Sequence, residues 1–288
     1  MQPISEPAPG NPAPTGPALR ARTFVCMGTV VSLTVPVGPG EGLQADLARL
    51  EAATAAVEDQ FAALDAQFSL YRPDSEASRI ARGELTLLQA SPLMRELYAD
   101  AVRWRRRTEG AFTPERPDGL LDLSGLVKGY AIAEAGRSLA ALGVHDWCLN
   151  AGGDVLVSGS PAPSSAEPSP WLAGIVDPAD RRTLLGACPL GARPSPRLAL
   201  ATSGSAERGD HIWTVGLRGA SGPRRPEFTQ VSVAAQDIVT ADVLATAIVA
   251  GGRPTLDAVT ARWEVDVLAV ADDGGLLATP GFRAPRAA

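Results

Sequence analysis

The chain has 288 residues, of which 45% are hydrophobic and 20% charged; this composition is that of a soluble globular protein and excludes wholesale disorder. Its formal net charge of −6 argues against binding to duplex nucleic acid, which requires a basic surface. No apolar run is long enough to span a membrane.

The N-terminus reads MQPISEPAPGNPAPTGP, rich in proline and without the basic start and hydrophobic stretch of a signal peptide. We expect residues 1–20 to form a disordered tail and the protein to remain in the cytoplasm.

The next segments predict a hairpin followed by helices. Residues 23–35 are β-branched and apolar, with Gly28 as a possible bend. Apolar residues then recur every three or four positions from Leu43 to Phe68, which predicts one long amphipathic helix. A second helix begins at Ser91-Pro92, a cap followed by a first-turn proline, and runs to Gly110. A third is expected from about Lys128 to Gly143.

The second half is richer in strands. Short β-like runs, separated by turn residues, occur at 146–151, 154–159, 171–176, 198–203, 211–217 and 228–235. TADVLATAIVAGG predicts a helix that ends at Gly251, and a further helix near Thr255 precedes a last strand. Helices early and strands late indicate an α+β fold, a single domain over residues 21–280 with helices packed on a mostly antiparallel sheet, followed by a flexible tail at 281–288.

Two stretches in this second half have both a structural and a chemical reading. Gly152-Gly153 is typical of a hairpin turn, but a glycine pair also lets the backbone approach a ligand closely. Asp242 and Thr246 are four residues apart, so on a helix they share a face and could bind one hard cation; taken alone, the pattern favours the simpler interpretation that Asp242 caps the first helical turn.

Individual polar residues elsewhere are just as ambiguous. Lys128 could be a solvated helix end, Asp122 a charge near a helix start, and His211 a half-buried strand residue. Tyr71 fits the edge of a core or a stacking contact with a planar ligand. Cys26, Cys148 and Cys188 are expected to be buried, reduced thiols: with two histidines and no C-x-x-C spacing they do not suggest a zinc site, and any metal would be Mg²⁺ with oxygen ligands.

Taken in chain order, however, the segments resemble the ApbE family, the FAD:protein FMN transferases. The resemblance covers roughly residues 23–252, and its segments are MGTVVSL, FSLYRPDSEASRI, TEGAFTP, LDLSGLVKGYAIA, NAGGDVLVSG, WLAGIVDP, ALATSG followed by HI, VSVAA and ADVLATAIVAGG.

The resemblance implies a set of site residues. The implied FAD contacts are Met27, Tyr71, Ala111, Phe112, Thr113, Asp122, Lys128 and Val231. The implied Mg²⁺ ligands are Gly125 through its carbonyl oxygen, Asp242, Ala245 and Thr246, and the implied proton acceptor is His211. Thr113 stands where the family usually has aspartate.

The same resemblance implies a reaction. FMN would be transferred from FAD to a threonine of an acceptor flavoprotein, with release of AMP and with Mg²⁺ on the diphosphate. Two alternatives stay open at this point: hydrolysis of FAD to FMN and AMP, and a non-catalytic protein that binds FAD.

Overall fold

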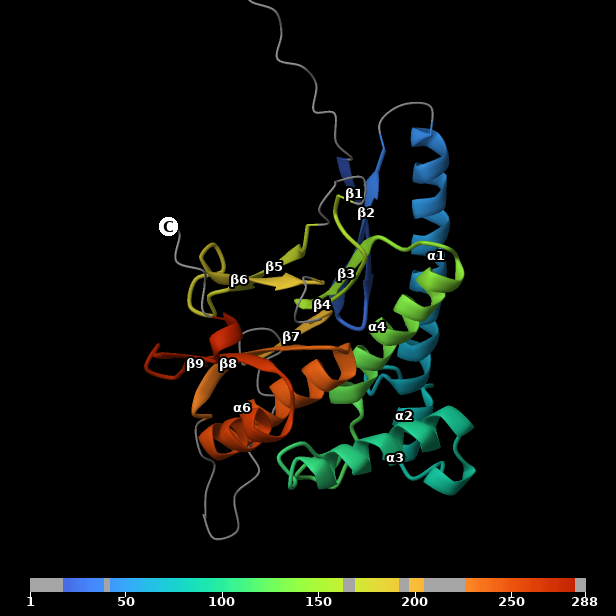
Figure 1. Cartoon of the computed structure of the whole chain (residues 1–288). Coiled ribbons are helices and arrows are strands. Elements are labelled where there is room, and N and C mark those ends of the chain that lie inside the picture. The colour runs from blue at the N-terminus through green and yellow to red at the C-terminus, as the bar shows by residue number, and fades with distance from the viewer. Residues whose placement is uncertain (1–17, 39–41, 163–168, 192–196, 205–225, 283–288) are drawn as a thin grey trace, which may run out of the picture.

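The computed structural model describes residues 18–38, 42–162, 169–191, 197–204 and 226–282. Its centre is an eight-stranded sheet with the order β1-β2-β3-β4-β7-β8-β9-β10, in which neighbouring strands run antiparallel (Figure 1). The strands are β1 (Ala18–Cys26), β2 (Thr29–Val37), β3 (Trp147–Ala151), β4 (Asp154–Ser158), β7 (Ala199–Gly204), β8 (Phe228–Ala235), β9 (Asp266–Ala271) and β10 (Leu276–Ala278).

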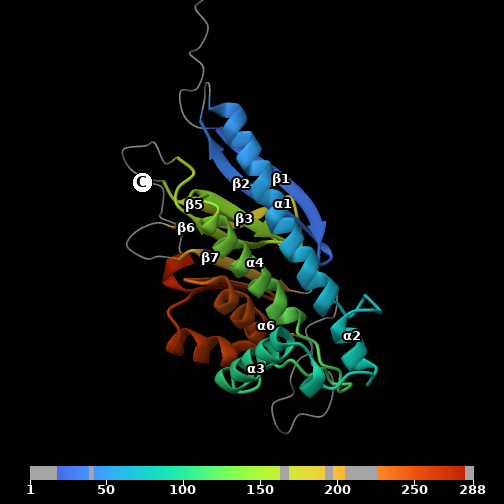
Figure 2. The same cartoon turned by 90° about the vertical axis from the view of Figure 1, so that its right-hand side faces the viewer.

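Helices cover one face of this sheet, and a two-stranded sheet covers part of the other (Figure 2). The helices are α1 (Leu43–Phe68), α2 (Glu76–Ala81), α3 (Pro92–Arg107), α4 (Ser124–Ala141) and α6 (Ile238–Arg262), with 3₁₀ turns at Leu87–Gln89 and Pro280–Phe282. The main core lies between the large sheet and α1, α4 and α6. The smaller core lies under β5 (Trp171–Val176) and β6 (Leu184–Leu190), where Trp171 and Leu190 pack on the outer face of the large sheet.

The predicted α+β fold is confirmed, and so is the long amphipathic helix. The apolar stripe of α1 is buried along its length, with Leu50, Val57, Phe61 and Leu64 all at most 6% exposed. The three-to-four-residue spacing therefore identified the helix and the face that it buries.

One helix start differs from the prediction. Helix α4 begins at Ser124, so Lys128 lies in its second turn and not at its entrance. The reason is local: the side chain of Asp122 accepts a hydrogen bond from Ser124 N at 2.9 Å and so fixes the first turn. The predicted helix end at Gly251 and the further helix near Thr255 are confirmed: α6 consists of two helices that meet at a kink at Gly252, whose φ of 66° is left-handed.

The ends of the chain and one predicted strand fall partly outside the described residues. Strand β1 begins at Ala18, three residues before the expected domain start, while residues 1–17 and 283–288 are not described. The strand expected at 211–217 also lies outside them. Strand β6 was not predicted, because Pro189 and two small residues interrupt its apolar pattern. Among the described residues no helix combines the length and the apolar character needed to cross a membrane.

Candidate functional site

Two tight turns and two strand ends meet at one edge of the large sheet. Because neighbouring strands alternate in direction, the β1–β2 turn, the β3–β4 turn, the end of β7 and the start of β8 share this edge. Both turns have two residues with positive φ, Met27-Gly28 (50° and 71°) and Gly152-Gly153 (63° and 93°), as type I′ hairpins require. The hairpin reading of the glycine pair is thus confirmed.

Helices α4 and α6 make a close contact beside this edge. Gly129 N donates to Asp242 Oδ2 at 3.1 Å, and a Cβ on Gly129 would lie 3.2 Å from the same oxygen. Asp242 is 3% exposed. In a regular helix the amide of Gly129 lies opposite the carbonyl of Gly125, so the Asp242 carboxylate contacts the turn of α4 that carries this carbonyl.

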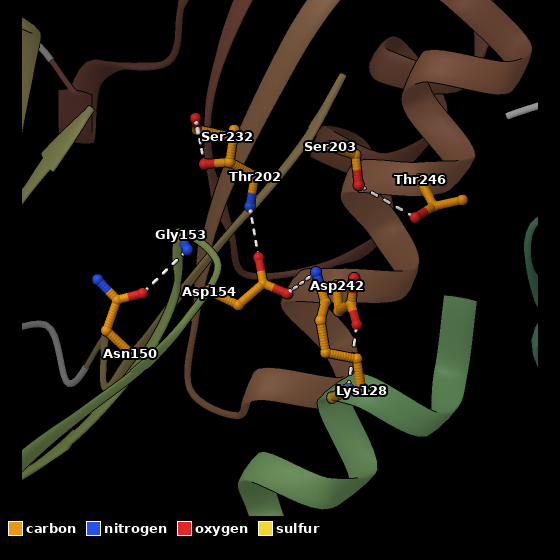
Figure 3. A network of polar contacts seen from close by, with 10 residues as sticks. Lys128, Asn150, Gly153, Asp154, Thr202, Ser203, Ser232, Asp242 and Thr246 are labelled. Atoms are coloured by element: carbon orange, nitrogen blue, oxygen red, sulfur yellow. Dashed lines mark hydrogen bonds and ion pairs between the residues drawn. The ribbon is translucent and has the colours of Figure 1, made fainter. Parts of the chain in front are cut away.

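Lys128 reaches from α4 toward the start of β4 and forms an ion pair with Asp154 Oδ2 (Figure 3). The lysine side chain is 11% exposed and the aspartate side chain 0%. The other carboxylate oxygen, Asp154 Oδ1, accepts a hydrogen bond from Thr202 N of β7 at 3.0 Å. The ion pair therefore joins three segments of the predicted motif set, around Lys128, around Gly153 and around Thr202.

Hydroxyl groups extend this network along β7 toward α6. The hydroxyl groups of Ser203 and Thr246 are 3.1 Å apart, and those of Thr202 and Ser232 are 2.8 Å apart. Strand β7 ends at Gly204, one residue after Ser203. Asp242 and Thr246 share one face of α6, as the four-residue spacing predicted, and this face points to the same edge of the sheet as Lys128 (Figure 3).

The segment before α4 is tied to the site by backbone contacts. Asp122 N donates to Pro114 O at 2.7 Å, so the residue that follows the predicted FAD contacts Ala111, Phe112 and Thr113 lies beside Asp122. The ring of Phe112 is 4% exposed and underlies Gly125: a Cβ there would meet the ring at 3.2 Å. Phe112 thus packs against Gly125, whose carbonyl is a predicted metal ligand.

The remaining predicted residues fall into three groups. Tyr71 is 84% exposed in the loop between α1 and α2, and Met27 is half-buried in its turn. Val231 and Ala245 are both 0% exposed and belong to the main core. His211 lies outside the described residues.

Asp154 was not singled out in the sequence, although it carries a central contact. The sequence did hold one indication of its role: the carboxylate follows a glycine pair directly and begins an apolar strand. A charge buried at such a position is costly unless it has a partner. The partner is 26 positions earlier in the chain, on a helix, and no local pattern links the two.

The three ionisable side chains in the network favour an added cation. Lys128 brings one positive charge, and Asp154 and Asp242 bring two negative charges, all of them largely buried. Within the described ranges there is no cluster of three or more His, Cys, Asp and Glu side chains that would hold a metal. A site here would combine one carboxylate with carbonyl and hydroxyl oxygens, a donor set that suits Mg²⁺ and not Zn²⁺.

The thiols take no part in this chemistry. All three cysteines are unpaired to one another. Burial raises the pKa of Cys148 to about 11, and burial together with the nearby Asp266 raises that of Cys188 to about 12. Burial and then Asp65 raise the pKa of Cys26, next to the Met27 turn. Protonated thiols are poor nucleophiles. Of the three thiols, which were expected to be reduced and buried, Cys188 is buried and Cys26 and Cys148 are half-buried.

Comparison with known proteins agrees with this arrangement of motifs. The model of the ApbE family matches residues 27–117 and 114–269, most of the chain. The chain belongs to the ApbE family. A curated FAD:protein FMN transferase from Rhodobacter capsulatus is 35% identical over 203 residues; the match covers 69% of this chain but 35% of that protein, so the chain spans about a third of its relative's length.

Solved structures share the fold. The ApbE protein of Thermotoga maritima superposes with a TM-score of 0.70 at 18% identity and covers 92% of this chain and 98% of its own. The flavin transferase ApbE of Vibrio cholerae gives 0.66 at 21% identity with the same coverage. The flavinyl transferase ApbE of Pseudomonas stutzeri, in its apo form, gives 0.67 at 20% identity, covering 93% and 97%. At these identities the similarity establishes a common architecture.

Proposed function

We propose that this ApbE-family chain transfers FMN from FAD to a threonine of an acceptor flavoprotein and releases AMP. The observation that carries the proposal is the polar network of Figure 3, where Lys128 and the Asp242–Thr246 face of α6 meet at the sheet edge that also carries the two hairpin turns. The name of the Rhodobacter capsulatus relative supports it.

FAD would lie along this edge. The exposed ring of Tyr71 is available to stack on the isoalloxazine, with Met27 beside it. Residues 111–113 and Asp122, held together by the Asp122–Pro114 backbone contact, would bind polar groups of the nucleotide. Lys128 would place its ammonium against the diphosphate. The predicted contact of Val231 stays a prediction.

The proposed metal ligands fit Mg²⁺ by their chemistry. Asp242 would supply the carboxylate, Gly125 a main-chain carbonyl from the turn of α4 that Asp242 contacts, and Thr246 a hydroxyl one turn farther along α6. Ala245 would take part only through its backbone. When bound, Mg²⁺ would neutralise and polarise the diphosphate oxygens.

The chemistry itself is a displacement at phosphorus. The acceptor threonine oxygen forms a bond to the FMN phosphorus, the bond from that phosphorus to the bridging oxygen breaks, and AMP leaves with the bridging oxygen. We assign the threonine proton to His211, whose ordinary pKa suits this transfer, and this role stays a prediction. The chain's contribution is position and charge neutralisation.

The test is incubation of the purified chain with FAD, with and without Mg²⁺, and with and without a candidate acceptor domain. AMP release is followed, and the acceptor is weighed by mass spectrometry. We expect an Mg²⁺-dependent gain of one FMN on the acceptor, and loss of this gain in Asp242→Asn. AMP without an adduct would instead indicate FAD hydrolysis, and FAD binding without AMP would indicate a binding protein.

A further inference from the structure

Asp154 is the most deeply buried charge among the network residues. Its side chain is 0% exposed, one carboxylate oxygen is held by Thr202 N, and the other pairs with Lys128. We propose that Asp154 is a positioning residue of the proposed transferase, which holds the ammonium of Lys128 where the diphosphate of FAD is bound. The inference deepens the proposed function and rests on it.

The identity of the cation argues for a functional pair. Lys128 is the single lysine among the 26 Lys and Arg residues of the chain, whereas arginine serves elsewhere, as in the Arg197–Asp266 pair. Arginine suits a fixed bidentate ion pair, while a lysine ammonium is a compact point charge whose donors can be shared with a second anion. If this ion pair served only to join α4 to β4, we would expect arginine at position 128, because arginine is the cation that the chain uses everywhere else.

The energetic argument points the same way. Burying both charges costs more desolvation energy than an apolar pair of similar size, so a buried ion pair is weak evidence for a purely stabilising role. The hydrogen bond from Thr202 fixes the plane of the carboxylate through Oδ1 and directs Oδ2 at the ammonium. Thr202 belongs to β7, whose next residue, Ser203, contacts Thr246. The position of the ammonium is therefore set by the same strand that touches the proposed metal face.

The pair also restricts the position of the ammonium. Lysine carries its ammonium on a flexible four-carbon stem, so the loss of one charged contact lets the group move and reach solvent more often. Replacing Asp154 by asparagine keeps the shape and an acceptor for Thr202 N but removes the charge. We therefore expect Lys128 to become less fixed and more reactive toward acylating reagents in Asp154→Asn.

Because the chain has one lysine, this reactivity can be read at a single site. Each variant is treated with acetic anhydride, and acetylation of the Lys128 peptide is quantified by mass spectrometry, apart from the N-terminal amine. We expect Asp154→Asn to react several-fold faster than the wild type. The matched control is Asp266→Asn, which makes the same change in a half-buried ion pair at the opposite edge of the sheet, and it should react at the wild-type rate.

Binding of FAD, measured by quenching of flavin fluorescence, shows whether the coupling reaches the nucleotide. We expect Asp154→Asn to weaken FAD binding by about tenfold or more, the size of one charge-assisted contact, and Asp266→Asn to change it less than about twofold. In a double-mutant cycle, Asp154→Asn should add nothing in a Lys128→Met background, because a positioning residue acts through the lysine.

The outcomes separate the two proposals. Wild-type FAD affinity in Asp154→Asn, or losses that add in the double variant, overturns the positioning role and leaves the transferase proposal intact. A wild-type chain that binds no FAD overturns both. If Asp154→Asn does not fold, Asp154→Glu keeps the charge but shifts the carboxylate by one methylene, and unchanged FAD affinity in that variant refutes the inference.

Discussion

The contact between α4 and α6 at Gly129 gives the most direct structural test of the candidate site. In Gly129→Ala the new Cβ would lie 3.2 Å from Asp242 Oδ2, 3.3 Å from Asp242 Cβ and 3.3 Å from Val239 Cα. One of these neighbours is backbone and the others belong to a short, buried side chain, so we expect α4 and α6 to shift apart by a few tenths of an ångström.

The expected magnitudes follow from this crowding. Overpacking costs about 1–3 kcal/mol, and the better helix propensity of alanine returns about 1 kcal/mol, so we expect a net destabilisation of about 0–2 kcal/mol. The shift also weakens the hydrogen bond from the Gly129 amide to Asp242. A hydrogen bond to a charged group contributes about 1.5–3 kcal/mol. The Mg²⁺ concentration needed for half-maximal AMP release should therefore rise about tenfold or more.

The matched control lies on the same helix. In Gly136→Ala the new Cβ would meet Leu156 Cδ2 and the Trp147 ring, each at 3.1 Å, with no contact to the polar network. Thermal unfolding should show comparable losses for both variants, whereas the Mg²⁺ titration should shift only for Gly129→Ala. An unshifted Mg²⁺ requirement in Gly129→Ala, or an equal shift in Gly136→Ala, would refute the assignment of this contact to the metal site.

Two further predictions concern titration. The pKa of Glu76 lies below its ordinary 4.5. Burial raises this pKa, but hydrogen bonds from Ser91 and Gln67 lower it by more. When folding lowers the pKa of a carboxyl group, that group stabilises the folded protein at any pH above its unfolded-state pKa. The stabilisation is lost as the pH falls through the folded-state pKa. Glu76→Gln should therefore be less stable than the wild type near neutral pH, with a difference that shrinks in chemical denaturation below about pH 4; a constant difference would contradict this. Cys148 and Cys188, with pKa values raised to about 11 and about 12, should resist iodoacetamide at about pH 8 in the native protein and react after denaturation. Rapid native alkylation would show that these sites open.

The fold was predictable wherever hydrophobic spacing and local turn chemistry act alone. The stripe of α1, the Ser91-Pro92 start of α3 and the Gly152-Gly153 turn each need only their neighbours in sequence. Strand β6 escaped prediction because its outer residues face solvent and its inner ones are Cys188 and Leu190 with Pro189 between them. What makes it a strand is pairing with β5, a tertiary effect.

The candidate site was predictable as a set of motifs but not as a set of contacts. The spacing of Asp242 and Thr246 correctly placed both on one face of α6. The sequence did not show that Phe112 is buried beneath Gly125, or that Val231 and Ala245 are enclosed in the core. Such differences depend on how α4 and α6 pack, which short patterns do not encode.

The ion pair of Lys128 and Asp154 shows why these motifs occur together. A buried ammonium needs an anion, a buried carboxylate needs a cation and an N–H donor, and neither tolerates the loss of its partner. Lys128 comes from α4, Asp154 from the turn into β4, and the N–H from Thr202 of β7, so the three segments satisfy one electrostatic requirement. Gly129, next to Lys128, allows α6 close enough for Asp242 to bind the same turn of α4. Segments separated in sequence are thus constrained jointly, which is why the set of motifs carries more information about the site than any single motif.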